Sequence, residues 1–391
     1  MTDVPAPASV EMIRKLVGFD TTSRNSNLDL IAYIEDYLRS LGIPTQRVLS
    51  EDGTKANLYA TVGPTDRPGI MLSGHTDTVP VDGQEWSAPP FAVQQRDGRL
   101  YGRGTADMKS FIAVVLAHAP EMIARPLRIP INFAFSYDEE VGCIGVRRLI
   151  EAIGHMPVRP AMCLVGEPTD MKVIIAHKGK VSIRARVRGF EAHSSLAPRG
   201  VNAIAYAAEL IVHLNRMAAR IAGNGPFDHA YDVPHTTVHT GVIAGGTALN
   251  IVPKDCSFEF EFRHLPEDDP QALLREVTEY ARNEIEPRMR AVHADTGFTF
   301  EERSTIPGLD IRDDEEVVRL AKALTGQNHH SKVAFGTEAG LFHLHAGIPT
   351  VICGPGSIDQ AHKPDEWIDL DQVARCDAFV RRLIDHVCAR P

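Results

Sequence analysis

The sequence predicts an α/β protein in which a mixed, mostly parallel sheet is sandwiched by helices and interrupted by an inserted α+β domain. Its expected sheet strands are short, apolar on both faces and rich in β-forming residues, as buried strands of a parallel sheet are. They cover residues 57–63, 69–75, 131–137, 161–167 and 349–356. Apolar residues at helical spacing lie before and between these strands, at 8–18, 27–41, 108–123 and 144–153. Such alternation of strands and helices is typical of an α/β sandwich.

The pattern changes after about residue 178. Residues 180–189 alternate polar and apolar side chains, as an antiparallel strand with one solvated face does. Helices and strands then follow in the order βαββαβ, which is the ferredoxin-like pattern. The helices are expected at 201–220 and 270–288, and the further strands at 236–245, 256–265 and 298–304.

We therefore predict an inserted dimerisation or lid domain at 179–304. The metal-binding, catalytic domain is expected at 1–178 and 305–391, and it ends in a helix at 371–388. A four-stranded sheet with helices on one face leaves an edge strand available for pairing. We expect a homodimer through that edge.

Composition excludes several classes of protein. The 391 residues are 43% hydrophobic and 24% charged, as in ordinary globular proteins, and the net charge of -10 disfavours binding to nucleic acid. Six cysteines are scattered without a C-x-x-C pair, which is typical of reduced thiols. The sequence contains no apolar signal segment and no run long enough to span a membrane. These features predict a soluble, cytoplasmic protein.

Candidate metal ligands follow the buried strands. They are His75, Asp107, the pair Glu139–Glu140, Glu167 and His362. Ligands of open α/β sheets collect at the carboxyl ends of the strands, so we expect these residues to meet in one crevice. Histidine and carboxylate ligands suit zinc, cobalt or manganese, and one bridging carboxylate can hold two ions that activate water. We expect two divalent ions, with zinc preferred and cobalt as an alternative.

Two further carboxylates have expected roles beside the metals. Consecutive residues at a strand end point to opposite sides, so one member of the Glu139–Glu140 pair can bind metal while the other acts as general base. Asp77 lies two residues after His75 and is placed to orient its imidazole.

Six ordered segments resemble the dinuclear-zinc aminoacylase and carboxypeptidase family. They are residues 73–80, 102–110, 138–140, 166–169, 192–195 and 361–366. The resemblance implies one metal held by His75, Asp107 and Glu167, and a second held by Asp107, Glu140 and His362. It makes Glu139 the general acid and base, and it implies a cis peptide bond after Asp107. It also implies that His193 stabilises the oxyanion in the active site of the partner subunit.

Further segments resemble the branch of that family that hydrolyses acetylornithine, a step of arginine biosynthesis. They are residues 245–253, 260–266, 335–342 and 353–366. This implies a small N-acyl amino acid as substrate, with Asn250 and Arg263 binding its α-carboxylate. An arginine suits that role because its guanidinium matches a carboxylate with two hydrogen bonds. From its charge alone, Glu338 is a candidate to meet the δ-ammonium group.

Other interpretations remain open at this point. The substrate can be another N-acyl amino acid or succinyl-diaminopimelate, and a non-catalytic metal-binding protein is a further alternative. Glu139 argues against the latter, because a binding protein needs no base beside its ligands. A nucleotide-binding enzyme is disfavoured because the glycine-rich residues 241–250 match neither phosphate-binding fingerprint. His193, Arg263 and Glu338 also have structural alternatives, as a loop histidine, an exposed strand residue and a helix-start carboxylate.

Overall fold

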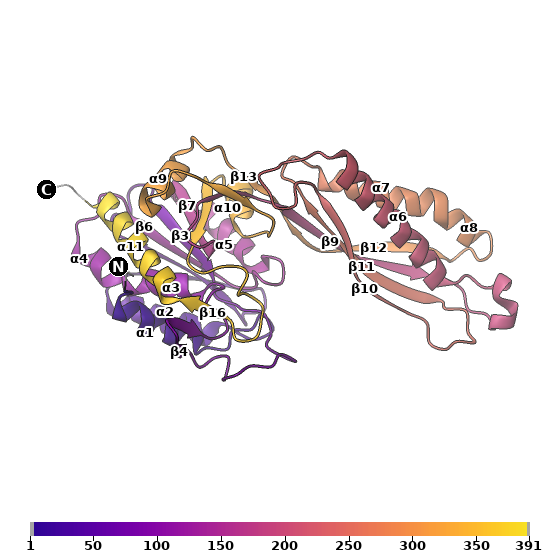
Figure 1. Ribbon diagram of the computed structural model, residues 1–391, viewed down its shortest axis with the longest axis horizontal. Coiled ribbons are helices and arrows are strands. Elements are labelled where there is room, and N and C mark those ends of the chain that lie inside the picture. Colours follow the sequence, from indigo (N-terminus) through magenta and orange to yellow (C-terminus); the bar gives the residue numbers. More distant parts are fainter. Residues whose placement is uncertain (1–3, 389–391) are drawn as a thin grey trace. The chain divides into compact units, whose positions relative to one another are not determined.

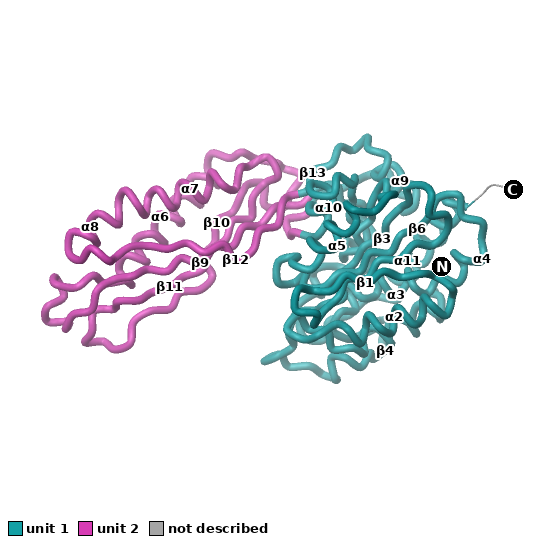
Figure 2. Tube along the Cα trace, turned by 180° about the vertical axis from the view of Figure 1, so that it is seen from behind, with its two compact units in different colours: residues 1–176, 309–332, 337–391 teal, residues 177–308, 333–336 magenta. Residues whose placement is uncertain are grey.

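The chain forms two compact units in the computed structural model, which describes residues 4–388 (Figure 2). Unit 1 comprises the residues up to Ala176, Leu309–Lys332 and the residues from Thr337 on. Unit 2 comprises His177–Gly308 together with Val333–Gly336. The division predicted from the sequence, at 179 and 304, lies within a few residues of the main boundaries, but it did not include the short return at 333–336.

A mixed sheet forms the centre of unit 1 (Figure 1). Its strand order is β1 (Thr45–Leu49), β2 (Ala56–Val62), β6 (Ile131–Ser136), β3 (Ile70–His75), β7 (Met162–Pro168), β15 (Thr350–Gly354), β8 (Ile174–His177) and β13 (Leu309–Asp310), and β14 (Ser331–Val333) pairs with β8. The central strands β6, β3, β7 and β15 are parallel to one another, whereas the pairs β1–β2, β2–β6 and β15–β8 are antiparallel. The predicted fold class, a mixed and mostly parallel sheet sandwiched by helices, is confirmed.

The two faces of this sheet pack against different sets of helices. One face shares a hydrophobic core with helices on that side, which are α1 (Pro7–Val17), α2 (Leu28–Ser40), α3 (Lys109–Ala117), α4 (Ala119–Ala124), α9 (Glu316–Thr325) and α11 (Leu370–Val387). The opposite face lies under α5 (Ile144–Gly154) and α10 (Ala339–Ala346) and carries polar side chains. On that face Asn57 donates to the carbonyl of Gly145, and Ser136 donates to Glu338.

The single helix expected at 108–123 is wrong in one respect, because it is interrupted at His118. Helix α3 ends at Ala117, and α4 begins at Ala119 with Pro120 in its first turn. Proline has no backbone N–H and is tolerated only at the start of a helix, so the chain begins a new helix there. The short strands β5 (Arg99–Tyr101), β4 (Gln94–Arg96) and β16 (Trp367–Asp369) form a separate small sheet that the sequence did not predict.

Unit 2 has the predicted βαββαβ order. Its strands are β9 (Gly179–Arg188), β10 (Thr237–Gly245), β11 (Asp255–His264) and β12 (Gly297–Ile306), which form an antiparallel sheet in the order β10-β11-β9-β12. Helix α6 (Ala203–Asn224) joins the first two strands. The helix expected at 270–288 is instead α7 (Pro270–Tyr280), a π-helical turn at Ala281–Ile285 and α8 (Glu286–Arg290).

Alternation along the strands of unit 2 separates a core face from a charged face. Val181, Ile183 and Phe260 are buried in a core shared with α6 and α7. On the other face, cross-strand ion pairs join β9 to β11, among them Arg184–Glu259 and Arg188–Asp255. This polar-out, apolar-in pattern is what a sheet covered on one face requires.

Candidate metal centre

Two clusters of metal-ligand side chains in unit 1 share Asp107. His75, Asp107 and Glu167 form one cluster, and Asp107, Glu140 and His362 form the other. In each cluster the ligand atoms lie within 4.8 Å of one another. His75 Nε2 is 3.0 Å from Asp107 Oδ1 and 3.8 Å from Glu167 Oε1. His362 Nε2 is 3.2 Å from Asp107 Oδ2 and 3.1 Å from Glu140 Oε2.

The sheet explains why residues so distant in sequence meet. Strand β3 ends at His75 and runs parallel to β6 and β7, so the carboxyl ends of the three strands lie at one edge. Glu140 follows β6, and Glu167 is the second-last residue of β7. Asp107 comes just before α3, and His362 lies in the loop after β15. The structure thus brings together the five residues predicted as metal ligands.

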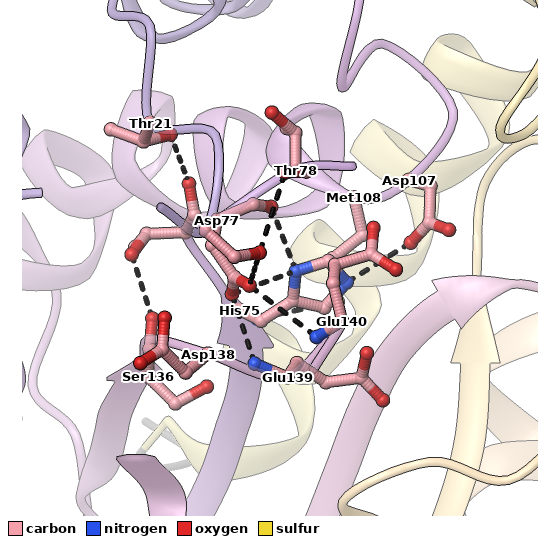
Figure 3. A network of polar contacts seen from close by, with 12 residues as sticks. Thr21, His75, Asp77, Thr78, Asp107, Met108, Ser136, Asp138, Glu139 and Glu140 are labelled. Carbon is pink, nitrogen blue, oxygen red and sulfur yellow. Dashed lines mark hydrogen bonds and ion pairs between the residues drawn. The ribbon is translucent and has the colours of Figure 1, made fainter. Parts of the chain in front are cut away.

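Asp77 connects His75 to the turn that carries the two glutamates (Figure 3). Its carboxylate accepts hydrogen bonds from the backbone N–H groups of Glu139 and Glu140, at 3.1 and 3.3 Å, and from Ser23 Oγ at 2.7 Å. His75 Nδ1 lies 3.0 Å from the Asp77 carbonyl oxygen and 3.5 Å from its carboxylate. The nearer partner of the imidazole is therefore the main chain, and the carboxylate chiefly holds the glutamate turn.

The turn before the glutamates has an unusual backbone. Asp138 has a φ of 56°, in the left-handed region that non-glycine residues rarely adopt. Lys55 Nζ holds the Asp138 carboxylate at 2.5 Å. Neither Lys55 nor Ser23 was found from the sequence, because nothing in its local pattern relates β2 or the loop before α2 to this turn.

Burial and crowding of carboxylates dominate the electrostatics of the centre. Burial raises the pKa of Glu167 and Glu139 well above the ordinary value, and neighbouring carboxylates add to the increase. Burial and the charge of Asp107 raise the pKa of Glu140 to about 7. Burial opposes ionisation of Asp107 as well, but its bonds with His362 and His75 outweigh this and lower its pKa.

The pKa values of the two histidines are raised as well, because their anionic partners favour the imidazolium form. Hydrogen bonds to Asp107 and Glu140 raise the pKa of His362 to about 10. Burial lowers the pKa of His75, but the charge of Glu167 and the bonds to Asp107 and Asp77 exceed that effect and raise it well above its usual value. Ligands of this kind must release their protons when a metal ion binds, so metal binding at this centre is expected to depend on pH.

The donor set fits two divalent ions. Each cluster offers one imidazole nitrogen, one terminal carboxylate and the shared Asp107, a combination suited to zinc and similar ions. Glu140 Oε1 is buried and has no hydrogen-bond partner among the described residues, so it is free to accept a cation. The peptide bond between Asp107 and Met108 is cis, as the resemblance implied.

Glu139 lies outside both clusters of ligands found in the described residues. Its Oε1 accepts a weak hydrogen bond from Cys143 Sγ at 3.4 Å, and its backbone N–H is held by Asp77. It is therefore a carboxylate fixed next to Glu140 but not engaged with either histidine. The two side chains thus have different partners, and the predicted roles of Glu140 as metal ligand and Glu139 as base stay predictions.

Glu338 directly precedes α10 and contacts the last residue of β6. Only 1% of it is exposed, and its Oε1 accepts a hydrogen bond from Ser136 Oγ at 2.5 Å. Burial raises its pKa to about 7, and Oε2 has no hydrogen-bond partner among residues 4–388. The predicted contact of Glu338 with a substrate ammonium group stays a prediction, and this burial does not favour it.

The other predicted site residues belong to unit 2. His193 and Asn250 lie on adjacent segments, since Ser194 N–H donates to the Asn250 carbonyl at 3.0 Å and His193 bridges to Ile251. His193 Nδ1 contacts Ser195 Oγ at 2.7 Å. Arg263 lies on β11 and donates to Glu261 at 2.9 Å. The structure thus brings His193 and Asn250 together, and their roles stay predictions together with that of Arg263.

Comparison with known proteins agrees with this arrangement. Peptidase family M20/M25/M40 matches residues 71–386. The chain is 35% identical to an acetylornithine deacetylase of Myxococcus xanthus over 395 residues, and 33% identical to one of Photorhabdus laumondii over 399. These alignments cover 98% and 99% of this chain, and the same shares of the relatives.

Solved structures share the fold. An M20 family metallo-carboxypeptidase from Sulfolobus solfataricus superposes with a TM-score of 0.75 at 16% identity, covering 97% of this chain and 99% of that one. The aminopeptidase PepT from Bacillus cereus gives 0.73 at 21% identity, covering 98% and 99%. Among residues 4–388, no helix has the length and apolar character needed to cross a membrane.

Proposed function

Because the chain belongs to peptidase family M20/M25/M40 and is a metal-dependent amidohydrolase, we propose that it hydrolyses N2-acetyl-L-ornithine to L-ornithine and acetate. The observation that carries the chemistry is the pair of ligand clusters sharing Asp107, with Glu139 beside them. The substrate is supported by relatives named acetylornithine deacetylase, which are 32–35% identical over nearly the whole chain. The reaction would supply ornithine for arginine biosynthesis.

We propose zinc as the metal, with cobalt as an alternative, held by His75 and Glu167 on one side, by Glu140 and His362 on the other, and by Asp107 between them. Bound there, the two ions would lower the pKa of a water molecule and polarise the acetyl carbonyl. The imidazole and carboxylate donors of this chain support that assignment.

We assign to Glu139 both proton transfers of the hydrolysis. Its carboxylate removes a proton from the attacking water as the new C–O bond forms at the acetyl carbon. Glu139 then gives that proton to the amide nitrogen as the C–N bond breaks, so that ornithine leaves as the amine and acetate remains. The raised pKa of Glu139 supports this role, because burial favours a carboxyl group that can hold the proton between the two steps.

The residues of unit 2 are assigned to substrate binding and oxyanion stabilisation. Arg263 and Asn250 bind the α-carboxylate, and a partner protomer supplies His193, whose imidazole donates a hydrogen bond to the oxygen that becomes negative. We propose a homodimer through unit 2, in which the edge strand β10 exposes Val242 and Ile243. The six buried, unpaired cysteines, which all lie within the described residues, support a reducing compartment such as the cytoplasm.

A substrate panel tests the proposal. Enzyme reconstituted with zinc is offered acetylornithine, acetylcitrulline, acetylmethionine and succinyl-diaminopimelate, and kcat/KM is measured for each. Acetylornithine should be preferred over acetylcitrulline, which lacks the ammonium group, by about 10- to 100-fold, the worth of one hydrogen bond to a charged group. Preference for another amide would reassign the substrate within the family. Hydrolysis of none of them by metal-loaded protein would contradict the proposed function.

A further inference from the structure

Glu366 is a buried carboxylate that belongs to neither metal cluster. It lies four residues after His362 and is 1% exposed. Its Oε1 accepts hydrogen bonds from three backbone N–H groups of the turn that precedes α3: Gly104 at 3.0 Å, Ala106 at 2.8 Å and Asp107 at 3.1 Å. One oxygen atom therefore holds the main chain of the residue that both clusters share.

The second oxygen of Glu366 leads to the other side of the centre. Oε2 accepts a hydrogen bond from Arg103 Nη1 at 2.6 Å, and Arg103 is fully buried. The other end of the guanidinium, Nη2, donates to Gln84 Oε1 at 2.7 Å. Gln84 Nε2 in turn donates to the carbonyl oxygen of His362 at 3.0 Å. A continuous chain of hydrogen bonds thus joins the main chain of Asp107 to the main chain of His362.

We infer that Glu366, Arg103 and Gln84 form a bracket that positions Asp107 and His362 for metal binding, with Glu366 holding the shared ligand and Gln84 holding the second. This inference rests on the proposed function, because it assumes that the two clusters bind metal. The three are positioning residues, since Glu366 and Gln84 bind the backbone of the ligands and Arg103 joins their side chains.

The local backbone explains why such a bracket is needed. The segment from Gly102 to Met108 is a series of turns without regular secondary structure, so its N–H groups find no partners in a helix or strand. Glu366 supplies acceptors for three of them and leaves the Asp107 carboxylate directed at the two histidines. His362 itself has a φ of 64°, in the left-handed region, and half of its side chain is exposed. A ligand with so little packing depends on hydrogen bonds for its position.

The alternative is that the buried pair serves only to stabilise the fold. A buried ion pair is a weak source of stability, because the cost of removing both charges from water offsets most of their attraction. Here the pair is joined to both sides of the metal centre, which hydrophobic residues of the same volume could not be. Residues that hold the ligands of a metal from outside typically contribute about 10- to 100-fold to metal affinity.

If the bracket positions the ligands, Glu366→Gln and Gln84→Ala should change the affinities of the two metal sites differently. Glu366→Gln keeps the size of the side chain but removes its charge and places an amide against Arg103 or the turn. Because Asp107 is shared, we expect both metals to bind about 10- to 100-fold more weakly. Gln84→Ala removes the link to His362 and the acceptor of Arg103 Nη2, but it leaves the bonds of Glu366 to the Asp107 turn in place. The metal of the His75 cluster should therefore keep its affinity while the other metal binds more weakly. The loss of metal affinity in Gln84→Ala should therefore resemble that in His362→Ala but be smaller.

The experiment titrates metal-free, full-length protein with zinc by calorimetry, and with cobalt by visible absorption, which reports the ligand geometry. Wild type, Glu366→Gln, Gln84→Ala and His362→Ala are compared. Asp369→Asn is the matched control, because this carboxylate follows Glu366 closely but pairs with the partly exposed Arg99. Urea denaturation of each metal-free variant checks folding, and Gln84→Ala keeps the test valid if Glu366→Gln does not fold.

Each outcome has a defined meaning. Wild-type zinc affinities and cobalt spectra in both Glu366→Gln and Gln84→Ala would overturn the bracket, as would equal weakening in Asp369→Asn. Wild-type protein that binds two metals but hydrolyses no acetylornithine would contradict the proposed function and leave the bracket in place. Wild-type protein that binds no metal would overturn both.

Discussion

Glu139 and Glu140 are neighbours in sequence, yet their side chains meet different partners. Glu140 lies 3.1 Å from His362 and belongs to a metal cluster, whereas Glu139 contacts Cys143 and neither histidine. Asp77 binds both of their backbone N–H groups and so fixes the turn from which the two side chains diverge. This divergence supports the proposal that Glu140 holds a metal ion while Glu139 carries a proton.

This difference predicts opposite effects of the same substitution at the two positions. Glu139→Gln should keep both metals and lower kcat by roughly 10²- to 10⁴-fold, because it removes only the group that carries the proton. Glu140→Gln should lose one metal. Metal content measured on dialysed protein, together with kcat for acetylornithine, distinguishes them. A Glu139→Gln enzyme that turns over at the wild-type rate would exclude Glu139 as the base.

His177 gives a pH dependence of stability that is independent of the metals. It is fully buried in unit 2 and Nδ1 bonds the Lys178 carbonyl at 2.9 Å. Burial lowers its pKa from 6.5 to about 4. The folded state therefore keeps His177 neutral while the unfolded state takes up a proton below pH 6.5, so the stability due to this group falls as pH drops from 6.5 toward 4. The loss is about 1.4 kcal/mol at pH 5.5 and about 3 kcal/mol in full.

The measurement is the urea unfolding free energy of metal-free protein at pH 7.5 and pH 5.5. His177→Gln should lose less stability than wild type between these values, by about 1.4 kcal/mol. His239→Gln, at an exposed position of β10, is the control and should follow wild type. Equal pH dependence in all three proteins would show that His177 is not held neutral.

At the scale of the elements, one buried aspartate of α11 connects this helix to α1 and to the break between α3 and α4. Asp377 of α11 accepts hydrogen bonds from the Ala6 backbone N–H at 2.7 Å and from Ser9 Oγ at 2.5 Å, at the start of α1. It also lies 2.9 Å from His118 Nε2, at the break between α3 and α4. His118, at the break before Pro120, thus contacts a residue 259 positions away in the sequence.

Removing this aspartate should destabilise unit 1. Asp377→Ala leaves several buried donors without an acceptor, and we expect a loss of about 2–3 kcal/mol in the free energy of unfolding. Asp371→Ala, on the same helix but in an exposed pair with Arg375, should change it by less than about 0.5 kcal/mol. Urea denaturation of both variants gives the comparison. Equal free energies of unfolding for the two variants would show that the hydrogen bonds of Asp377 do not stabilise unit 1.

The elements that the sequence predicted most readily are those in which apolar and polar residues alternate regularly. The alternation in β9 and β11 and the βαββαβ order of unit 2 are visible in the sequence, because one face of that sheet is buried and the other solvated. The strands β4, β5 and β16 were missed, since three residues carry no measurable period. The π-helical turn after α7 was missed as well, because its apolar spacing differs little from that of an α-helix.

At the scale of the whole molecule, the metal ligands and the substrate-binding candidates are divided between the units. The ligands and Glu139 belong to unit 1, whereas His193, Asn250 and Arg263 belong to unit 2. A homodimer in which His193 serves the partner's metal centre makes each site depend on two chains.

Mixed dimers test that dependence. His193→Ala and Glu139→Gln should each be nearly inactive, but a heterodimer of the two contains one site with both residues intact. Purified by two different tags, it should recover about half of the wild-type activity per dimer. A heterodimer as inactive as its parents would place His193 and Glu139 of the same chain in one site. Wild-type activity of His193→Ala itself would exclude His193 from catalysis.

The sequence by itself determined the fold class, the family and the set of candidate metal-ligand residues. Strand-end position and residue type are local properties, and they were enough to select His75, Asp107, Glu167 and His362. Only the tertiary structure decided how these residues are held. The bracket of Glu366, Arg103 and Gln84 and the anchoring of the glutamate turn by Asp77 depend on hydrogen bonds between segments that lie far apart in the chain. Local periodicity carries no record of such contacts, because they arise only when the parallel strands bring their carboxyl ends to one edge.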